Sequence, residues 1–134
     1  MIKKNITKSS KFLVDEAKKQ ISNISANDAV NLHKDKNYLF IDLRDIRELK
    51  NTGKIKDAKH VPRGMLEFWI DPDSPYHKDF FSKNYNFIFY CASGWRSALS
   101  TLTAKQMGFL KNVSHIEGGF NQWLEINGPI EKLN

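Results

Sequence analysis

A continuous run of four apolar and aromatic residues, Phe87–Tyr90, leads into a loop of small and polar residues, Cys91–Gly94. Such a run beside turn-forming residues predicts a buried strand of a parallel sheet. After the loop, apolar side chains recur at roughly helical spacing, at Ala98, Leu99, Leu102 and Met107. The pattern therefore places the loop where a buried strand ends and a helix begins.

Strands are predicted to alternate with helices along the chain. A short apolar run predicts a buried strand at Tyr38–Ile41, and other short strands are expected at Ala58–Val61 and Val113–Ile116. Helices are expected over Lys11–Ile21, Ser25–His33, Ile46–Lys50 and Met65–Ile70, and around Phe120, Trp123 and Leu124. This alternation predicts an α/β fold with a largely parallel sheet and helices on both faces.

Single residues set the expected ends and faces of these helices. Ser25 and Asp45 are candidate N-caps, because their side-chain oxygens can accept hydrogen bonds from the first helical turn. Gly53 is expected to stop the helix that Asp45 starts, and Glu48 on that helix is expected to face solvent. The core-facing residues of the first helix are expected to be Phe12, Leu13, Ala17 and Ile21.

Composition narrows the class of protein. A chain of 134 residues, 40% hydrophobic and 27% charged, is typical of one soluble globular domain. One cysteine excludes an intramolecular disulfide and a cysteine-based zinc site, and suits a reducing compartment. No apolar run follows the basic N-terminus, and none is long enough to span a membrane. We therefore expect a cytoplasmic protein that needs no membrane.

The net charge of +6 is concentrated at the N-terminus. Residues 1–20 carry six lysines against two acidic residues, whereas the rest of the chain is nearly neutral. A basic leader helix on such a domain is more typical of a solvated face than of a nucleic-acid-binding surface. A basic site does help an anionic substrate to arrive. The histidines lack metal-ligand spacing, so we expect no metal site; they are His33, His60, His77 and His115.

The chemistry of the loop points to Cys91 as a nucleophile. Unpaired N–H groups and the positive end of the helix dipole stabilise anions at a helix N-terminus, and a thiol placed there ionises easily. Gly94 lets the chain curl closely, and Arg96 adds a cation suited to oxyanions. The alternative is that Cys91 is a small buried hydrophobic residue at a strand end. Such a residue would require neither Gly94 nor Arg96, so the functional interpretation is favoured.

Several other segments point to the same edge of the sheet. Arg44, Arg63 and Gly118 each fall just past the end of a predicted strand, as Cys91 does. In open parallel sheets, ligands bind beyond the carboxyl ends of the strands. His60 and His115 are interpreted as strand-end or packed histidines rather than as catalytic bases, because an ionised Cys91 needs no base.

Four motifs in this order resemble those of the rhodanese family, specifically single-domain sulfurtransferases. The motifs are Ile41–Arg44 with Glu48, Ala58–Pro62, Cys91–Ser97, and Glu117–Phe120 with Trp123 and Gly128-Pro129. The resemblance covers Ile24 to Ile130 and implies a three-layer fold with a central five-stranded, mainly parallel sheet. It divides the chain into a basic lead-in and helix, residues 1–23, and a rhodanese-like domain, residues 24–130.

The resemblance also implies an activity. Cys91 would take sulfane sulfur from thiosulfate or a related small anionic donor, hold it as a persulfide, and pass it to a thiol, to cyanide or to a protein acceptor, without a cofactor. Arg44 would either bind the sulfonate of the donor or form an ion pair with Glu48, and Arg63 would assist. The persulfide would be held by the backbone N–H groups of Ala92, Ser93, Gly94, Trp95 and Arg96.

This chain departs from the family pattern at two places. Many members have Gly-His-Ile-x-Gly-Ala where this chain has Gly53–Ala58, so the local turn lacks the usual histidine and second glycine. Trp95 is bulky for its loop position, and its ring would narrow the choice of acceptor if it covered the loop. Phe68 and Trp69 would either wall the pocket or pack in the core.

Other functions compete with sulfur transfer. Cysteine phosphatases and arsenate reductases also place Cys before Arg at a helix N-terminus, but here only four residues separate Cys91 from Arg96, one fewer than in cysteine phosphatases. A persulfide carrier or thiol sensor would stop at the loaded Cys91. A non-catalytic binding module is disfavoured, because Cys91, Gly94 and Arg96 are all in place.

Overall fold

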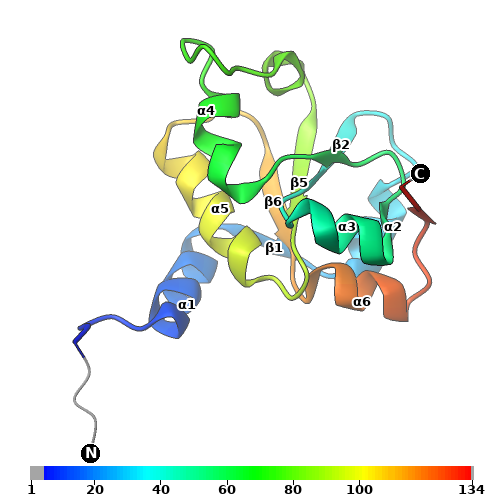
Figure 1. The fold of residues 1–134 in the computed structure, drawn as a ribbon, viewed down its shortest axis with the longest axis horizontal. Coiled ribbons are helices and arrows are strands. Elements are labelled where there is room, and N and C mark those ends of the chain that lie inside the picture. The colour runs from blue at the N-terminus through cyan, green and yellow to red at the C-terminus, as the bar shows by residue number, and fades with distance from the viewer. Residues whose placement is uncertain (1–4, 134) are drawn as a thin grey trace, which may run out of the picture.

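A computed structural model describes residues 5–133. The first four residues of the predicted lead-in lie outside the described residues, and the domain boundary after residue 23 stays a prediction. The core is a five-stranded parallel sheet in the order β1-β6-β5-β2-β4 (Figure 1). Its strands are β1 (Ser22–Ile24), β2 (Tyr38–Asp42), β4 (Lys59–His60), β5 (Asn86–Tyr90) and β6 (Val113–Ile116). The predicted α/β fold with a five-stranded parallel sheet is confirmed.

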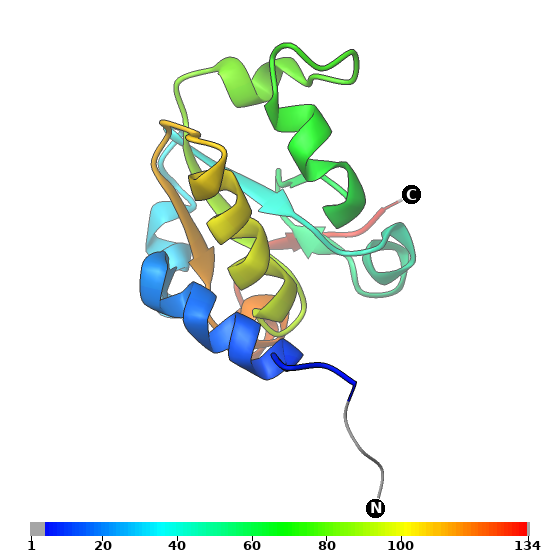
Figure 2. The same ribbon diagram turned by 90° about the vertical axis from the view of Figure 1, so that its left-hand side faces the viewer.

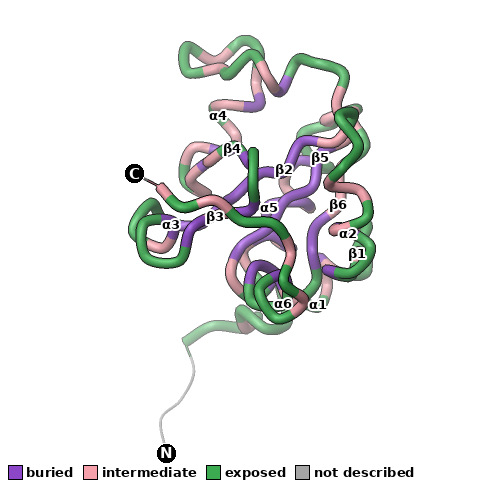
Figure 3. Tube along the Cα trace, turned by 90° about the vertical axis from the view of Figure 1, so that its right-hand side faces the viewer, coloured by how far each residue is buried: buried purple, intermediate pink, exposed green. Residues whose placement is uncertain are grey.

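The central strand, β5, is apolar throughout because helices cover both of its faces. Phe87 and Phe89 pack into one hydrophobic cluster, and Ile88 and Tyr90 into another on the opposite face. Successive side chains of a strand alternate between faces, so a strand buried on both sides reads as a continuous apolar run. Figure 3 shows the same burial along β2 and β5.

Helices form the outer layers of the fold (Figures 1 and 2). One face of the sheet is covered by α2 (Ala26–Leu32) and α6 (Gly119–Glu125), whose side chains join the cluster around Ile88. The other is covered by α4 (Leu66–Ile70) and α5 (Trp95–Gln106), and α1 (Ser10–Gln20) packs on α5. The remaining helices are α3 (Ile46–Thr52) and two short 3-10 helices, η1 (Arg63–Met65) and η2 (Asp79–Ser82).

The expected helix caps are confirmed. The Ser25 hydroxyl accepts a hydrogen bond from the Asp28 N–H at 3.1 Å at the start of α2. Asp45 starts α3 in a capping box with Glu48, and Gly53 ends that helix with a φ of 79°. The two caps fix where α2 and α3 begin relative to the strands beside them.

The predicted inner face of α1 is wrong in part. Val14 and Ala17 are buried against Ala98 of α5, whereas Phe12 and Leu13 are exposed. Small and β-branched residues let the two helices approach closely, so the contact follows this stripe rather than the largest side chains. None of the helices in residues 5–133 is both long and apolar enough to cross a bilayer.

The other differences between the predicted and the observed elements concern short strands. The predicted strand Ala58–Val61 is reduced to β4, and β1 was not expected because Ser22–Ile24 has one apolar residue. A two-stranded antiparallel pair was also not expected: β3 (Lys54–Ile55) with β7 (Ile130–Glu131). The unusual turn before Ala58 still forms, with Asp57 at a φ of 67° where the family pattern has glycine. Lys54 Nζ donates to the Ala58 carbonyl in that turn.

Candidate active site

The Cys91 loop connects the central strand β5 to α5. Gly94 has a φ of 101°, and a Cβ atom there would lie 3.3 Å from the Gly118 nitrogen. A side chain at this position would therefore be both strained and crowded. The N-terminus of α6 holds the other side of the loop, since the N–H groups of Phe120 and Asn121 donate to the carbonyls of Cys91 and Ala92 at 2.8 and 3.0 Å.

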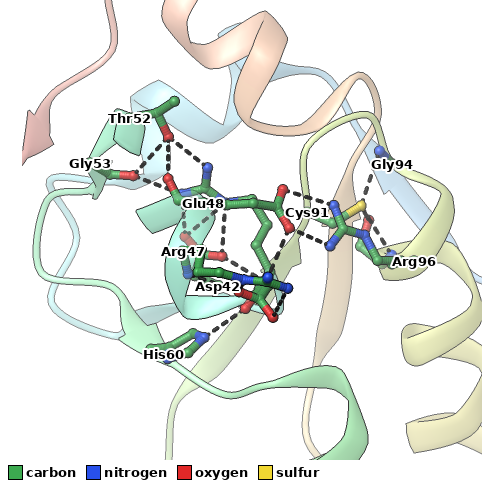
Figure 4. A network of polar contacts seen from close by, with 12 residues as sticks. Asp42, Arg47, Glu48, Thr52, Gly53, His60, Cys91, Gly94 and Arg96 are labelled. Carbon is green, nitrogen blue, oxygen red and sulfur yellow. Dashed lines mark hydrogen bonds and ion pairs between the residues drawn. The ribbon is translucent and has the colours of Figure 1, made fainter. Parts of the chain in front are cut away.

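The sulfur of Cys91 faces the backbone of its own loop (Figure 4). Sγ accepts hydrogen bonds from the Gly94 and Ser97 N–H groups at 3.2 and 3.3 Å. Cys91 is 1% exposed, yet it belongs to none of the hydrophobic clusters. Within residues 5–133, the first N–H groups of α5, those of Trp95 and Arg96, have no hydrogen-bond partner. The loop therefore presents donors both to the sulfur and to an anion beside it.

Arg96 extends from the loop to α3. Its Nη1 and Nη2 donate to the two carboxylate oxygens of Glu48 at 2.8 and 3.1 Å (Figure 4). The pair lowers the pKa of Glu48 and raises the pKa of Arg96, to which the Cys91 sulfur also contributes. The prediction that Glu48 faces solvent is wrong in part: the side chain is half-buried, and its carboxylate forms an ion pair with the arginine of the loop.

Arg44 follows β2, and its partners differ from both expectations for this residue. It is 2% exposed, and it donates from Nε and Nη2 to the Asp42 carboxylate at 2.8–3.2 Å, not to Glu48. Thr52 Oγ1 and the Gly53 carbonyl accept its remaining bonds, at 2.9 and 2.7 Å. Burial opposes the charge of Arg44, but Asp42 outweighs burial and raises its pKa. A buried guanidinium with its donors in use does not bind a donor sulfonate.

Arg63 and the nearby aromatic residues also lie away from the sulfur. Arg63 donates to Glu67 at 2.8 Å and to Thr103, near the far end of α5, at 3.4 Å, so its hydrogen bonds connect α4 with α5 and not with the Cys91 loop. Phe68 is exposed and lies edge-to-face with Tyr76, whereas Trp69 packs against the buried cluster around Phe87 and beneath the Lys78 ammonium. The Trp95 ring, which is 46% exposed, points outward at the start of α5.

His60 lies at the end of its strand and His115 is packed in the interior, as expected, but His115 also contacts the serine that lies beside the Cys91 sulfur. His60 Nε2 lies 2.6 Å from the Arg44 carbonyl at the end of β4. His115 is fully buried in β6, with Nδ1 at 2.9 Å from Ser97 Oγ and Nε2 at 2.7 Å from Asn23 Oδ1. Burial, with a smaller contribution from Lys18, lowers the pKa of His115 to about 4. Across residues 5–133, no group of three or more acidic, histidine or cysteine side chains is arranged to hold a metal ion.

The family assignment follows from comparison with known proteins. A family model described as the rhodanese-like domain matches residues 25–126, most of the chain. The chain belongs to the rhodanese-like domain family. The match includes the double-glycine segment beside the Cys91 loop and both strands that flank β5.

Individual relatives support the same family. A Rhodopseudomonas palustris protein of unknown function, described as a possible tyrosine phosphatase, is 47% identical with a TM-score of 0.91, over 98% of this chain and 100% of that one. The polysulfide-sulfur transferase homodimer of Wolinella succinogenes is 32% identical with a TM-score of 0.67, over 90% of this chain and 85% of its own. The rhodanese-like domain described here is thus related to sulfur-transfer proteins.

A longer relative contains a region similar to this domain. The tRNA uridine(34) hydroxylase of Buchnera aphidicola is 32% identical over 110 residues, which are 82% of this chain. The chain spans about a third of that protein's length, 34%. The similarity therefore extends over only part of that protein.

Sequence reasoning placed the loop of this rhodanese-like domain but missed partners that surround it. The structure brings together Cys91, Ala92, Ser93, Gly94, Trp95 and Arg96 as expected, while Arg44 and Arg63 lie elsewhere. Glu48, Ser97 and His115 contact the loop but were given no role at the site. Adjacent parallel strands offered a clue for His115, since it pairs in register with Phe89, two residues before Cys91.

Proposed function

We propose that this protein is a sulfurtransferase that moves sulfane sulfur from thiosulfate or a related donor to a thiophilic acceptor through a Cys91 persulfide. One observation carries the proposal. The Cys91 sulfur accepts two backbone hydrogen bonds inside a loop in which four residues separate it from Arg96. A ring of N–H groups of this size suits a sulfur anion.

The reaction proceeds by two displacements at sulfur. The Cys91 thiolate attacks the outer sulfur of thiosulfate, a new S–S bond forms, and the donor's S–S bond breaks so that sulfite leaves with the electron pair. A thiolate or cyanide then attacks the outer sulfur of the persulfide, and the Cys91 thiolate leaves. Electrons balance without a cofactor or an external oxidant, as in other covalent nucleophilic mechanisms.

Each part of the loop has a role in this mechanism. The unpartnered N–H groups of Trp95 and Arg96 stabilise the outer sulfur of the persulfide as an anion, aided by the dipole of α5. Ala92 and Ser93 form the bend that aims these groups, and the Arg96 guanidinium attracts the anionic donor. The acceptor is a thiol of the reducing cytoplasm, either a small molecule or a protein.

Phosphate ester hydrolysis is a second candidate because the Rhodopseudomonas palustris relative is described as a possible tyrosine phosphatase. Both reactions use a cysteine thiolate at a helix N-terminus. The loop of this chain is one residue shorter than that of cysteine phosphatases, which disfavours a tetrahedral phosphate. We expect turnover of thiosulfate and no useful hydrolysis of an aryl phosphate. Hydrolysis of an aryl phosphate without turnover of thiosulfate would instead identify the protein as a phosphatase.

Intact mass measurement after incubation with thiosulfate tests the proposed chemistry. Wild-type protein should gain the mass of one sulfur atom, and Cys91→Ser should fold and gain none. Thiocyanate release with cyanide then separates an enzyme from a carrier. Many turnovers support a sulfurtransferase, whereas one equivalent per protein indicates a persulfide carrier or sensor. Sulfur transfer by Cys91→Ser at the wild-type rate would refute the mechanism.

A further inference from the structure

A line of polar contacts leads from Cys91 into the protein, away from the mouth of the loop. Ser97 Oγ lies 3.5 Å from Cys91 Sγ and 2.9 Å from His115 Nδ1, and His115 Nε2 lies 2.7 Å from Asn23 Oδ1. Cys91, Ser97 and His115 are essentially inaccessible to solvent. The proposed sulfur transfer gives no role to Ser97 Oγ or to His115, so this buried titratable group requires an explanation.

The hydrogen-bond partners fix the direction of every bond in the line. Asn23 Nδ2 donates to the carbonyls of Lys18 and Ile21 at 2.9 and 3.2 Å, so Oδ1 faces His115 and accepts. His115 Nε2 therefore carries a proton. Because burial lowers the pKa of His115 to about 4, the ring is neutral near pH 7 and its Nδ1 is an acceptor.

This arrangement fixes the orientation of the Ser97 hydroxyl. Its single hydroxyl proton is donated to His115 Nδ1, so the side of Oγ that faces Cys91 presents lone pairs. Only a protonated sulfur can bond to such an oxygen, and the Cys91 S–H donates to it. Three donors in series then point the same way, from the thiol to the hydroxyl to the imidazole.

We propose that Ser97 and His115 form a buried relay that accepts the thiol proton of Cys91 when the sulfur becomes a nucleophile. The S–H bond breaks as its proton binds Ser97 Oγ, the original Ser97 proton moves to His115 Nδ1, and the electron pair stays on sulfur. The products are a thiolate, an imidazolium and a Ser97 hydroxyl that now donates to the thiolate. This relay rests on the proposed function, because it names the group that activates the nucleophile.

The charges near His115 determine when it can hold a second proton. Burial and, to a smaller extent, Lys18 of α1 disfavour a lone imidazolium. On the loop side, the Arg96 cation forms an ion pair with Glu48 and also interacts with the Cys91 sulfur. The anion that compensates a protonated His115 is therefore the Cys91 thiolate, or the persulfide that replaces it. A buried ion pair is far less costly than a single buried charge, so the proton moves only as the sulfur anion forms.

The ionisation of Cys91 tests this relay without any sulfur donor. Cys91 is the only cysteine, so thiolate absorbance and the rate of alkylation as a function of pH report on it alone. His115→Gln can accept from Ser97 and donate to Asn23, but it takes up no proton. We expect the midpoint of ionisation to rise by about one pH unit or more, and alkylation below the midpoint to slow about tenfold. Ser97→Ala should shift the midpoint in the same direction, and the double variant should shift it no further.

A matched histidine provides the control. His77 pairs with a serine hydroxyl, Ser82 Oγ, at 2.8 Å in a segment that does not contact the loop, so His77→Gln should leave the midpoint unchanged. A folded His115→Gln variant with an unchanged or lowered midpoint would overturn the relay. If that variant does not fold, Ser97→Ala decides the question by the same criterion, since it interrupts the same path.

The proposed function can fail independently of the relay. If the midpoint rises in His115→Gln but wild-type protein gains no sulfur from thiosulfate, the relay stands and sulfur transfer from that donor is refuted. If wild-type protein gains sulfur and the midpoint does not move, transfer stands and the relay is refuted.

Discussion

Glu48 is the residue through which α3 reaches the Cys91 loop. Its carboxylate accepts from the Asp45 N–H at 3.2 Å in the capping box and also binds the Arg96 guanidinium. A carboxylate in this place repels an anionic donor and occupies the cation that would attract it. We therefore expect Glu48 to limit how tightly an anionic donor binds at the loop.

Replacing Glu48 by glutamine should improve the affinity for thiosulfate. Glutamine preserves the capping box but removes the charge, and relief of repulsion on the order of 1 kcal/mol lowers KM about fivefold. Thermal stability should change little, because a half-exposed ion pair contributes about 0–1 kcal/mol. Steady-state thiocyanate formation gives KM. Glu67→Gln, which removes the Arg63–Glu67 ion pair outside the loop, should leave KM unchanged. An increase of KM in Glu48→Gln would contradict this account.

Arg44 should matter for stability and not for binding of the donor. Arg44→Met leaves the Asp42 carboxylate buried without its partner, so the free energy of unfolding should fall by about 3–5 kcal/mol. Urea denaturation measures this loss, and Asp42→Asn combined with Arg44→Met should restore much of it. A stable Arg44→Met protein with a raised KM for thiosulfate would instead return Arg44 to the substrate site.

At the residue scale, the sequence predicted the position of the Cys91 loop but not the partners of the arginines. Cys91 and Gly94 were placed correctly because strand, loop and helix are contiguous in the chain. Asp42 and Glu48 both lie near Arg44, and the path of the backbone decides which of them it pairs with. Arg44 turns back onto Asp42, two residues earlier at the end of β2, which leaves Glu48 for Arg96.

At the scale of helices and strands, two glycines with positive φ angles flank α5. Gly94 must adopt a left-handed conformation and also lies against the turn that precedes α6. Gly108, after α5, has a φ of 74° with no atom near its missing Cβ. The two positions therefore share backbone strain, but only Gly94 combines it with contact to a second loop.

Gly94→Ala and Gly108→Ala separate these two effects. Each should lose about 1–2 kcal/mol of stability through left-handed strain, measured by thermal unfolding. Gly94→Ala should also lose persulfide formation, because the shifted Gly94 N–H no longer meets the Cys91 sulfur at 3.2 Å. Gly108→Ala should form persulfide as the wild type does. Equal persulfide formation by both variants would show that the loop does not depend on this N–H group.

Elements with strong apolar runs were predicted well, and short ones were not. The extents of β2 and β5 follow closely from apolar runs that are buried on both faces, and β6 matches its prediction although only Val113 and Ile116 in it are apolar. By contrast, β1 is an edge strand whose pairing with β6 is supplied by the rest of the sheet, so its own three residues carry little indication of it. The inner face of α1 was predicted wrongly in part, because the small side chain of Ala98 on α5 packs against Val14 and Ala17 rather than against larger residues.

At the scale of the whole molecule, parallel topology collects distant segments at one sheet edge. The Cys91 loop from the end of β5, Glu48 from α3 and the α6 N-terminus meet there. Alternating strands and helices were sufficient to predict this architecture and the position of the loop. The line from Cys91 to Asn23 could not be predicted, since it needs the register of Phe89 with His115 and the placement of β1.

His115 also couples the stability of the whole molecule to pH. It is buried among α1, α5, β1 and β6, and its pKa is lowered from 6.5 to about 4 in the folded protein. Between these values the unfolded chain binds more protons than the folded one, so stability is complete above about pH 6.5 and falls as the pH decreases toward 4. The expected loss is roughly 3 kcal/mol.

Urea denaturation at a series of pH values should therefore show stability decreasing already between pH 6.5 and 4.5. Carboxylates with lowered pKa values, such as Asp45 at about 2 and Glu48, add their own losses below this window, because their unfolded pKa values are 3.8 and 4.5. In His115→Gln, the free energy of unfolding should change little between pH 6.5 and 4.5. Its decrease at lower pH, where carboxylates become protonated, should remain. If His115→Gln keeps the wild-type slope between pH 6.5 and 4.5, the imidazole is not held neutral by burial, and another histidine must supply the titration.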